Sequence, residues 1–118
     1  MKKVTPIPRP DRLRSHSSSF GWVDHRLLRG GHLAGLSVEA MACYLFLVLA
    51  ADRNGISYYR IESTAKHLGY LDFSAIHGAR DELQSADLVA FQPFAQHDPN
   101  GFTQVLSLDG MVARSVAR

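Results

Sequence analysis

The chain has 118 residues, 46% of them hydrophobic and 20% charged, which suits one small domain and is too short for two of ordinary size. A single cysteine excludes a disulfide framework, and the longest apolar run is too short to cross a bilayer, so we expect a cytoplasmic protein with no membrane partner. The net charge of +2 is unevenly divided, because residues 1–19 hold five basic residues and one acidic residue, whereas the rest holds eight basic and ten acidic residues.

Residues 1–19 are a basic N-terminal arm, in which arginines are set among prolines and serines that resist compact folding. We expect this arm to be flexible and to contact DNA through Arg9, Arg12 and Arg14, which makes binding steeply dependent on salt. A disordered tail that only aids solubility is the alternative. The arm precedes a predicted domain over residues 20–109 and a C-terminal tail over residues 110–118.

The first half of the domain predicts two helices. Apolar residues recur at helical spacing over residues 22–28, and this short helix should end near the glycine pair that begins at Gly30. Ser37 is a good N-cap for a second helix, which should continue until the Asn-Gly pair that ends at Gly55. Because this second helix is apolar on nearly every side, we expect it to be central and buried, with Cys43 as an inert thiol.

The second half of the domain predicts a helix-turn-helix. Residues 56–59 are β-branched and aromatic and predict a small strand. A helix over residues 61–69 should end at Gly69, and after a turn a second helix should run from about Phe73 to Ala86. The apolar stripe of this second helix is expected to hold Phe73, Ile76, Ala79 and Leu83. Its opposite face presents Ser74, His77, Gly78, Asp81 and Gln84.

Two further strands, LVAFQPF and FTQVLSL, bracket the loop AQHDPNG, whose Pro, Asn and Gly favour a connection between antiparallel strands. The last residues, GMVARSVAR, can form a frayed helical turn. The predicted fold class is therefore α+β and mainly α. It is a winged helix-turn-helix with three to four helices and a small antiparallel sheet.

The run AIHGARDELQSADLV resembles the recognition helix and following strand of GntR-type and related bacterial winged-helix regulators, whose pattern is T-V-R-x-A-L-x-x-L-x-x-x-G-L-V. Ile76, Ala79, Leu83 and the pair Leu88-Val89 stand at matching apolar positions, and Asp87 replaces the glycine. More broadly, residues 44–90 resemble winged-helix domains of plasmid and phage replication or regulatory proteins. The resemblance implies a DNA-binding domain whose second motif helix enters the major groove.

Candidate DNA contacts follow from this arrangement. On the helix that begins near Phe73, Ser74 and His77 can bond to base edges or phosphates, and Gly78 allows close approach. A merely solvated face is the alternative. Candidate phosphate contacts before and on the first motif helix are Tyr59, Arg60, Thr64 and Lys66. The wing loop has no lysine or arginine, so we expect it to contact DNA weakly or to serve another purpose, such as dimer contact.

Enzyme chemistry is not expected. The six histidines form no H-x-x-x-H pair and the cysteine is alone, so no metal site or cofactor is predicted. We expect a sequence-specific protein that binds double-stranded DNA, either a bacterial transcriptional regulator or an accessory in plasmid or phage replication. A homodimer, with contacts from Phe20, Trp22 and the first helix, would match two-fold DNA sites. The alternative is a winged-helix module that binds a protein partner without reading DNA.

Overall fold

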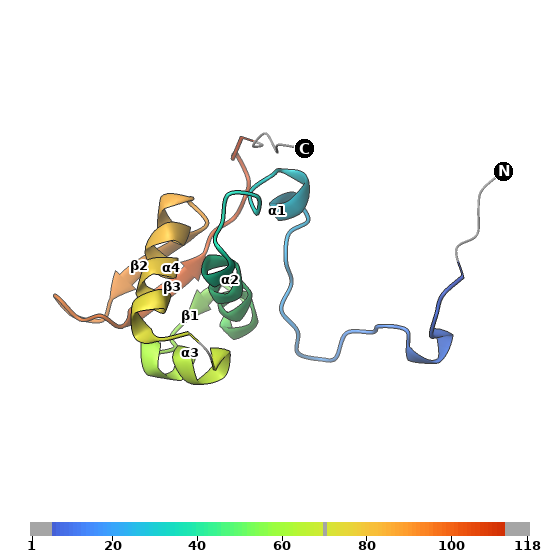
Figure 1. The fold of residues 1–118 in the computed structure, drawn as a ribbon, viewed down its shortest axis with the longest axis horizontal. Coiled ribbons are helices and arrows are strands. Elements are labelled where there is room, and N and C mark those ends of the chain that lie inside the picture. Colours follow the sequence, from blue (N-terminus) through green and yellow to red (C-terminus); the bar gives the residue numbers. More distant parts are fainter. Residues whose placement is uncertain (1–5, 70, 113–118) are drawn as a thin grey trace.

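The computed structural model describes residues 6–69 and 71–112. Within them lie a 3₁₀ helix, four α-helices and three strands (Figure 1). The helices are η1 (Pro10–Arg12), α1 (Arg26–Arg29), α2 (Val38–Ala50), α3 (Ile61–Leu68) and α4 (Phe73–Ser85). The strands are β1 (Ile56–Ser57), β2 (Val89–Pro93) and β3 (Gly101–Val105). This α+β arrangement is compatible with a winged-helix-like layout.

Helix α2 is central, and it packs against α3, α4, β1 and β3. Ser37 is its N-cap, as predicted, since the Ser37 hydroxyl oxygen accepts a hydrogen bond from the Ala40 N–H at 3.1 Å. The predicted end was wrong. The helix stops at Ala50, and the chain then makes a turn in which the Asp52 carboxylate accepts hydrogen bonds from two backbone N–H groups, before Gly55 adopts a φ of +82°.

Burial of α2 on every side was also wrong. Its inner side chains are buried, Cys43 among them, and burial raises the pKa of that thiol to about 11. Its outward side is open, because Leu45 is 53% and Leu49 65% exposed, and Val38 and Met41 are exposed on the same side. The helix therefore has an apolar stripe that no described residue covers.

Helices α3 and α4 follow one another closely, at the positions predicted for the two motif helices. Helix α3 ends where Gly69 takes a φ of +76°. Asp72 is the N-cap of helix α4, and its carboxylate accepts a hydrogen bond from the Ala75 N–H at 2.8 Å. The apolar stripe of α4 is confirmed at Ile76, Ala79 and Leu83, whereas Phe73 in the first turn is half exposed and lies outside the core.

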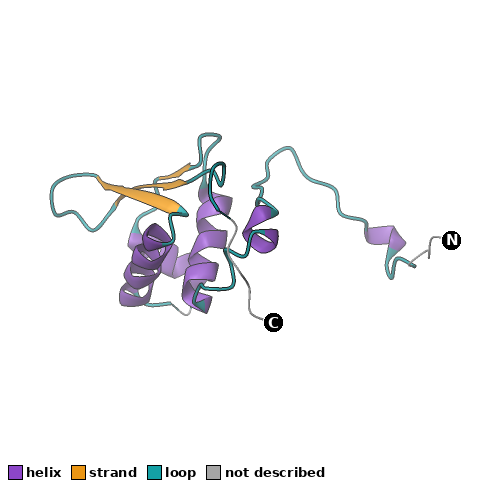
Figure 2. Cartoon of the chain, turned by 90° about the horizontal axis from the view of Figure 1, so that it is seen from above, coloured by secondary structure: helices purple, strands orange, loops and turns teal. Residues whose placement is uncertain are grey.

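The sheet is antiparallel in the order β1-β3-β2 and lies on one side of the helices (Figure 2). The β2–β3 hairpin confirms the two strands predicted around AQHDPNG. Strand β1 is shorter than expected, because only its first two residues pair with β3. The helices and the inner face of the sheet enclose one core, which holds Leu27, Leu36, Ala40, Cys43, Tyr44, Val48, Ile61, Leu71, Ile76, Ala79, Leu83, Leu88, Val89 and Leu108.

The N-terminal half of the domain departs most from the prediction. Helix α1 has only four residues, and residues 22–23 lie before it in an extended segment. Residues 6–20 are exposed, contain η1, and run away from the helices (Figure 1). Closer to the domain, the backbone passes against α2, since a Cβ on Gly21 would lie 2.9 Å from the Val48 carbonyl oxygen. Of the predicted C-terminal tail, residues 113–118 lie outside the described residues.

Candidate nucleic-acid interface

The outward face of α4 is open along most of its length. Ser74 and Gly78 are exposed, as are Asp81 and Gln84 further along. A side chain at Gly78 would meet no atom within 4 Å, so a ligand could approach the helix backbone closely there. The Ser74 hydroxyl makes no hydrogen bond to any described residue and is available to an external partner.

His77 lies at the edge of this face and is half-buried. Its Nδ1 is 3.1 Å from Nη2 of Arg80, one turn away. Because a guanidinium can only donate, His77 Nδ1 accepts this hydrogen bond, which leaves Nε2 as the donor of the ring. The contact with Arg80 engages Nδ1, so Nε2 is the ring nitrogen left for a ligand.

Arg80 is directed towards the hairpin rather than to the outward face. Its guanidinium lies 3.6 Å from the ring centre of Phe91, and its Nη1 donates to the Pro99 carbonyl oxygen at 3.0 Å. Burial lowers the pKa of Arg80. The sequence analysis did not include Arg80 among the site residues. In the structure Arg80 binds the hairpin loop, which contains no lysine or arginine itself.

Glu82 is the acidic residue whose orientation matters most for a polyanion partner. Its carboxylate faces α2, where it accepts hydrogen bonds from the Ser37 N–H and the Ser37 hydroxyl, both at 2.7 Å. These bonds lower the pKa of Glu82. Asp81 is thus the one exposed carboxylate within the middle of α4, among the residues described.

The candidates on α3 separate into one that is buried and one that is free to bind. Thr64 is only 8% exposed, and its hydroxyl donates to the Arg60 carbonyl oxygen at 3.0 Å. The predicted phosphate contact by Thr64 is therefore corrected: its hydroxyl bonds back to a carbonyl of the preceding turn and is not exposed to a ligand. Lys66 is exposed and has no ion pair with any described residue.

Tyr59 and Arg60 precede α3, and both are exposed. The Tyr59 ring packs edge-on against Phe46 at 5.2 Å and against His67 at 5.7 Å, so its position is fixed by two helices. The Arg60 Nε lies 3.6 Å from a Glu62 carboxylate oxygen, a weak exposed pair that a phosphate can displace.

The three arginines of the arm differ in availability. Arg9 donates two hydrogen bonds to the Asp11 carboxylate, at 3.0 and 2.8 Å, and this pairing raises the pKa of Arg9 and lowers that of Asp11. Arg12 and Arg14 are exposed and form no ion pair with the described part of the chain. The structure does not bring these arginines together with the residues of α4.

Asn100, at the base of the hairpin loop, is a residue that sequence reasoning missed. It is buried, and its side-chain oxygen accepts a hydrogen bond from the Ile61 N–H at 2.8 Å, which caps a helix whose own N-cap residue, Arg60, supplies no side-chain bond. The two residues are 39 positions apart, so no local pattern reveals the contact.

No group of three or more metal-ligating side chains occurs among the described residues. Within the same residues, no helix is long and apolar enough to span a bilayer. Comparison of the chain with protein families, curated proteins and solved structures finds no match.

Proposed function

We propose that the chain is a winged helix-turn-helix protein that binds duplex DNA in a sequence-specific manner, as a transcriptional regulator or a replication accessory. The observation that supports this most directly is the outward face of α4. Ser74 and Gly78 are exposed in its N-terminal half, and Glu82 is turned away towards Ser37. In helix-turn-helix proteins that half of the second helix contacts base edges.

Electrostatics support the same proposal. The exposed cations Lys66 and Arg60 lie on and before the helix that crosses the DNA backbone in this class of protein, and Arg12 and Arg14 extend the positive charge along the arm. The hairpin loop has no cation, so the arm takes the place of a basic wing in attracting DNA.

A pair of matched substitutions on one helix tests the proposal. Ser74→Asp and Ser85→Asp each add one negative charge at an exposed serine of α4, in its first and last turns. With DNA selected from random duplexes, Ser74→Asp should weaken binding about tenfold or more, the cost of removing one interaction with a base or phosphate. Ser85→Asp should weaken binding much less. Equal affinities for both variants, at unchanged thermal stability, would contradict binding through α4.

A protein-docking module is the second candidate function, and a different observation favours it. The outward stripe of α2 exposes Val38, Leu45 and Leu49, and exposed apolar stripes of this kind commonly mark protein contacts. Under this alternative the selected DNA pool would show no enriched motif, and both aspartate variants would behave as the parent protein.

A further inference from the structure

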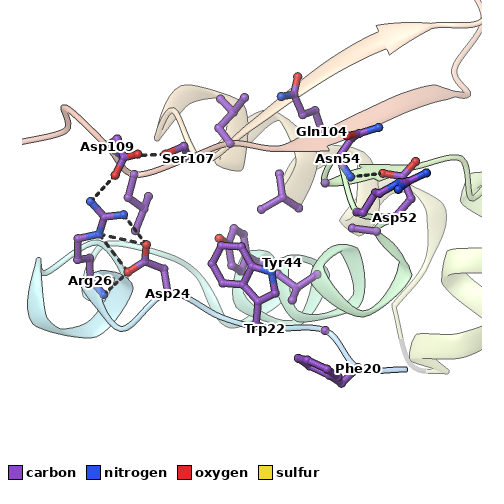
Figure 3. Close-up of a pocket in the computed structure, with 18 of the residues that line it drawn as sticks. Phe20, Trp22, Asp24, Arg26, Tyr44, Asp52, Asn54, Gln104, Ser107 and Asp109 are labelled. Carbon is purple, nitrogen blue, oxygen red and sulfur yellow. Dashed lines mark hydrogen bonds and ion pairs between the residues drawn. The ribbon is translucent and has the colours of Figure 1, made fainter. Parts of the chain in front are cut away.

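A groove of about 810 Å³ lies between the extended segment 18–24, helix α2 and the chain that follows β3 (Figure 3). Tyr44 and Val48 of α2 line it, and so does Leu108 after β3. These three side chains are buried, whereas Trp22 is 73% exposed and stands at its edge. The groove has the size of a small-molecule site, and its lining combines apolar and aromatic side chains with polar and charged ones.

Tyr44 supplies an unused polar group to this groove. The residue is only 6% exposed, and its hydroxyl has no hydrogen-bond partner among the described residues. Among the same residues, the one fully buried side-chain nitrogen or oxygen without a hydrogen-bond partner is Nε of Arg80, so the Tyr44 hydroxyl is not fully buried. The Tyr44 hydroxyl must therefore reach open space, and the groove is the open space that Tyr44 lines. In the groove this hydroxyl is open to water or to a ligand that can form a hydrogen bond with it.

One end of the groove holds an ionic network. Arg26 donates to Asp24 at 2.7 Å, and its other terminal nitrogen lies 2.8 Å from Asp109. Both carboxylates have lowered pKa values, that of Asp24 to about 2, because they accept hydrogen bonds from Arg26. At the other end Asp52 adjoins Arg53. The lining thus contains three aspartates and two arginines, which makes it net negative by one charge at neutral pH.

We propose that this groove binds a small organic cation, an ammonium group carried on an aromatic or aliphatic body. The body would lie against Val48 and the face of the Trp22 indole. The ammonium N–H would donate to the Tyr44 hydroxyl, within the net negative lining. Arg26 does not oppose such a ligand, since two carboxylates already neutralise it, and indole faces attract cations. This inference is independent of DNA binding.

The protein contains its own reporter for the test, because Trp22 is the only tryptophan in the sequence. We would titrate the full chain with 2-phenylethylammonium, 2-phenylethanol and 3-phenylpropionate, which share an apolar body and differ in charge. Tryptophan emission and calorimetry would be followed together. The cation should give a saturable change in both signals and bind at least about tenfold more tightly than the anion, an energy within the range of one charged contact.

Two substitutions locate the site. Tyr44→Phe removes only the hydroxyl and should weaken cation binding about two- to tenfold, the range for one hydrogen bond, without loss of thermal stability. Asp109→Asn makes the lining neutral and should reduce the preference for the cation over the alcohol. Tyr58→Phe is the matched control, since Tyr58 is exposed, lies outside this groove and packs edge-on against Phe102.

Three results would overturn the proposal. One is the absence of saturable heat and emission change with all three probes. Another is equal affinity for cation, alcohol and anion. The third is a Tyr44→Phe variant that binds the cation as the parent and Tyr58→Phe proteins do, which would place any binding elsewhere on the chain.

Discussion

Glu82 of α4 caps the start of α2 by accepting hydrogen bonds from both the backbone N–H and the hydroxyl of Ser37, each at 2.7 Å. Ser37 in turn accepts from the Ala40 N–H, so one serine and one glutamate satisfy the first turn of α2 together. In the usual capping box the glutamate lies three residues after the serine, whereas here it lies 45 residues away on another helix. The contact therefore fixes α2 against α4.

Glu82→Gln should make stability less sensitive to acid. The folded protein lowers the pKa of Glu82, so the ionised carboxylate contributes stability above its ordinary pKa, and this contribution is lost as pH falls through the lowered value. The parent protein should therefore be more stable than Glu82→Gln near neutral pH, by about 1 kcal/mol, and the two should converge in acid. Urea unfolding at several pH values measures the difference. A difference independent of pH would contradict the ionic role of Glu82.

Asn100→Ala should destabilise the protein by about 1–3 kcal/mol, because it leaves the Ile61 N–H without a partner at the start of α3. Amide hydrogen exchange at Ile61 should accelerate with it. Gln96→Ala, at an exposed position of the same loop, is the control and should change neither property. Unaltered protection of Ile61 in Asn100→Ala would show that another group caps the helix.

Asp87→Gly should stabilise the protein by a few tenths to about 1 kcal/mol. Asp87 has a φ of +61°, a left-handed conformation that costs most L-residues about 1–2 kcal/mol, Asp less than most, and that glycine adopts without steric strain, although its greater loss of chain entropy offsets part of the gain. Asp81→Gly, in the helical interior of α4, is the matched change and should lose about 1 kcal/mol. Thermal unfolding of the two variants should therefore shift in opposite directions, and a shift in the same direction would refute the strain assigned to Asp87.

The arm should control the salt dependence of DNA binding, if the proposed function holds. Replacing Arg12 and Arg14 by alanine should reduce the slope of log affinity against log salt by about two, one for each arginine that no longer neutralises a phosphate. Arg9→Ala should reduce it less, because Arg9 is already paired with Asp11. Affinities measured over a salt series with one duplex give the slopes. Identical slopes for all variants would exclude the arm from the complex.

The parts of the fold predicted correctly from sequence depend on neighbours along the chain. Ser37 caps a helix that starts one residue later, and Gly69 ends α3 because its own backbone takes a positive φ. The apolar spacing of Ile76, Ala79 and Leu83 likewise reports a single helix face. Each of these signals is contained within about two helical turns of sequence.

The predictions that the structure contradicts were wrong for a different reason. The stripe through Leu45 and Leu49 is as apolar as the buried side of α2, so composition could not tell which side the rest of the chain covers. Trp22 fits a helical spacing, yet it lies outside any helix, next to Gly21, whose backbone packs closely against the Val48 carbonyl of α2. For the candidate site, Thr64 looked available because its burial follows from how α3 packs against α2 and α4, which no local pattern reveals.

The contact between Asn100 and Ile61 also limits how this hairpin can be exchanged. Hairpin loops in many domains accept insertions and grafts, since their tips make few contacts with the remaining chain. Here the loop between β2 and β3 carries the acceptor for an amide of α3, and Arg80 holds the Pro99 carbonyl beside it. A hairpin transplanted from another protein, or one lengthened before Asn100, would not place a side-chain oxygen next to the Ile61 N–H. A replacement hairpin therefore has to supply an acceptor for the Ile61 N–H to keep the start of α3 satisfied.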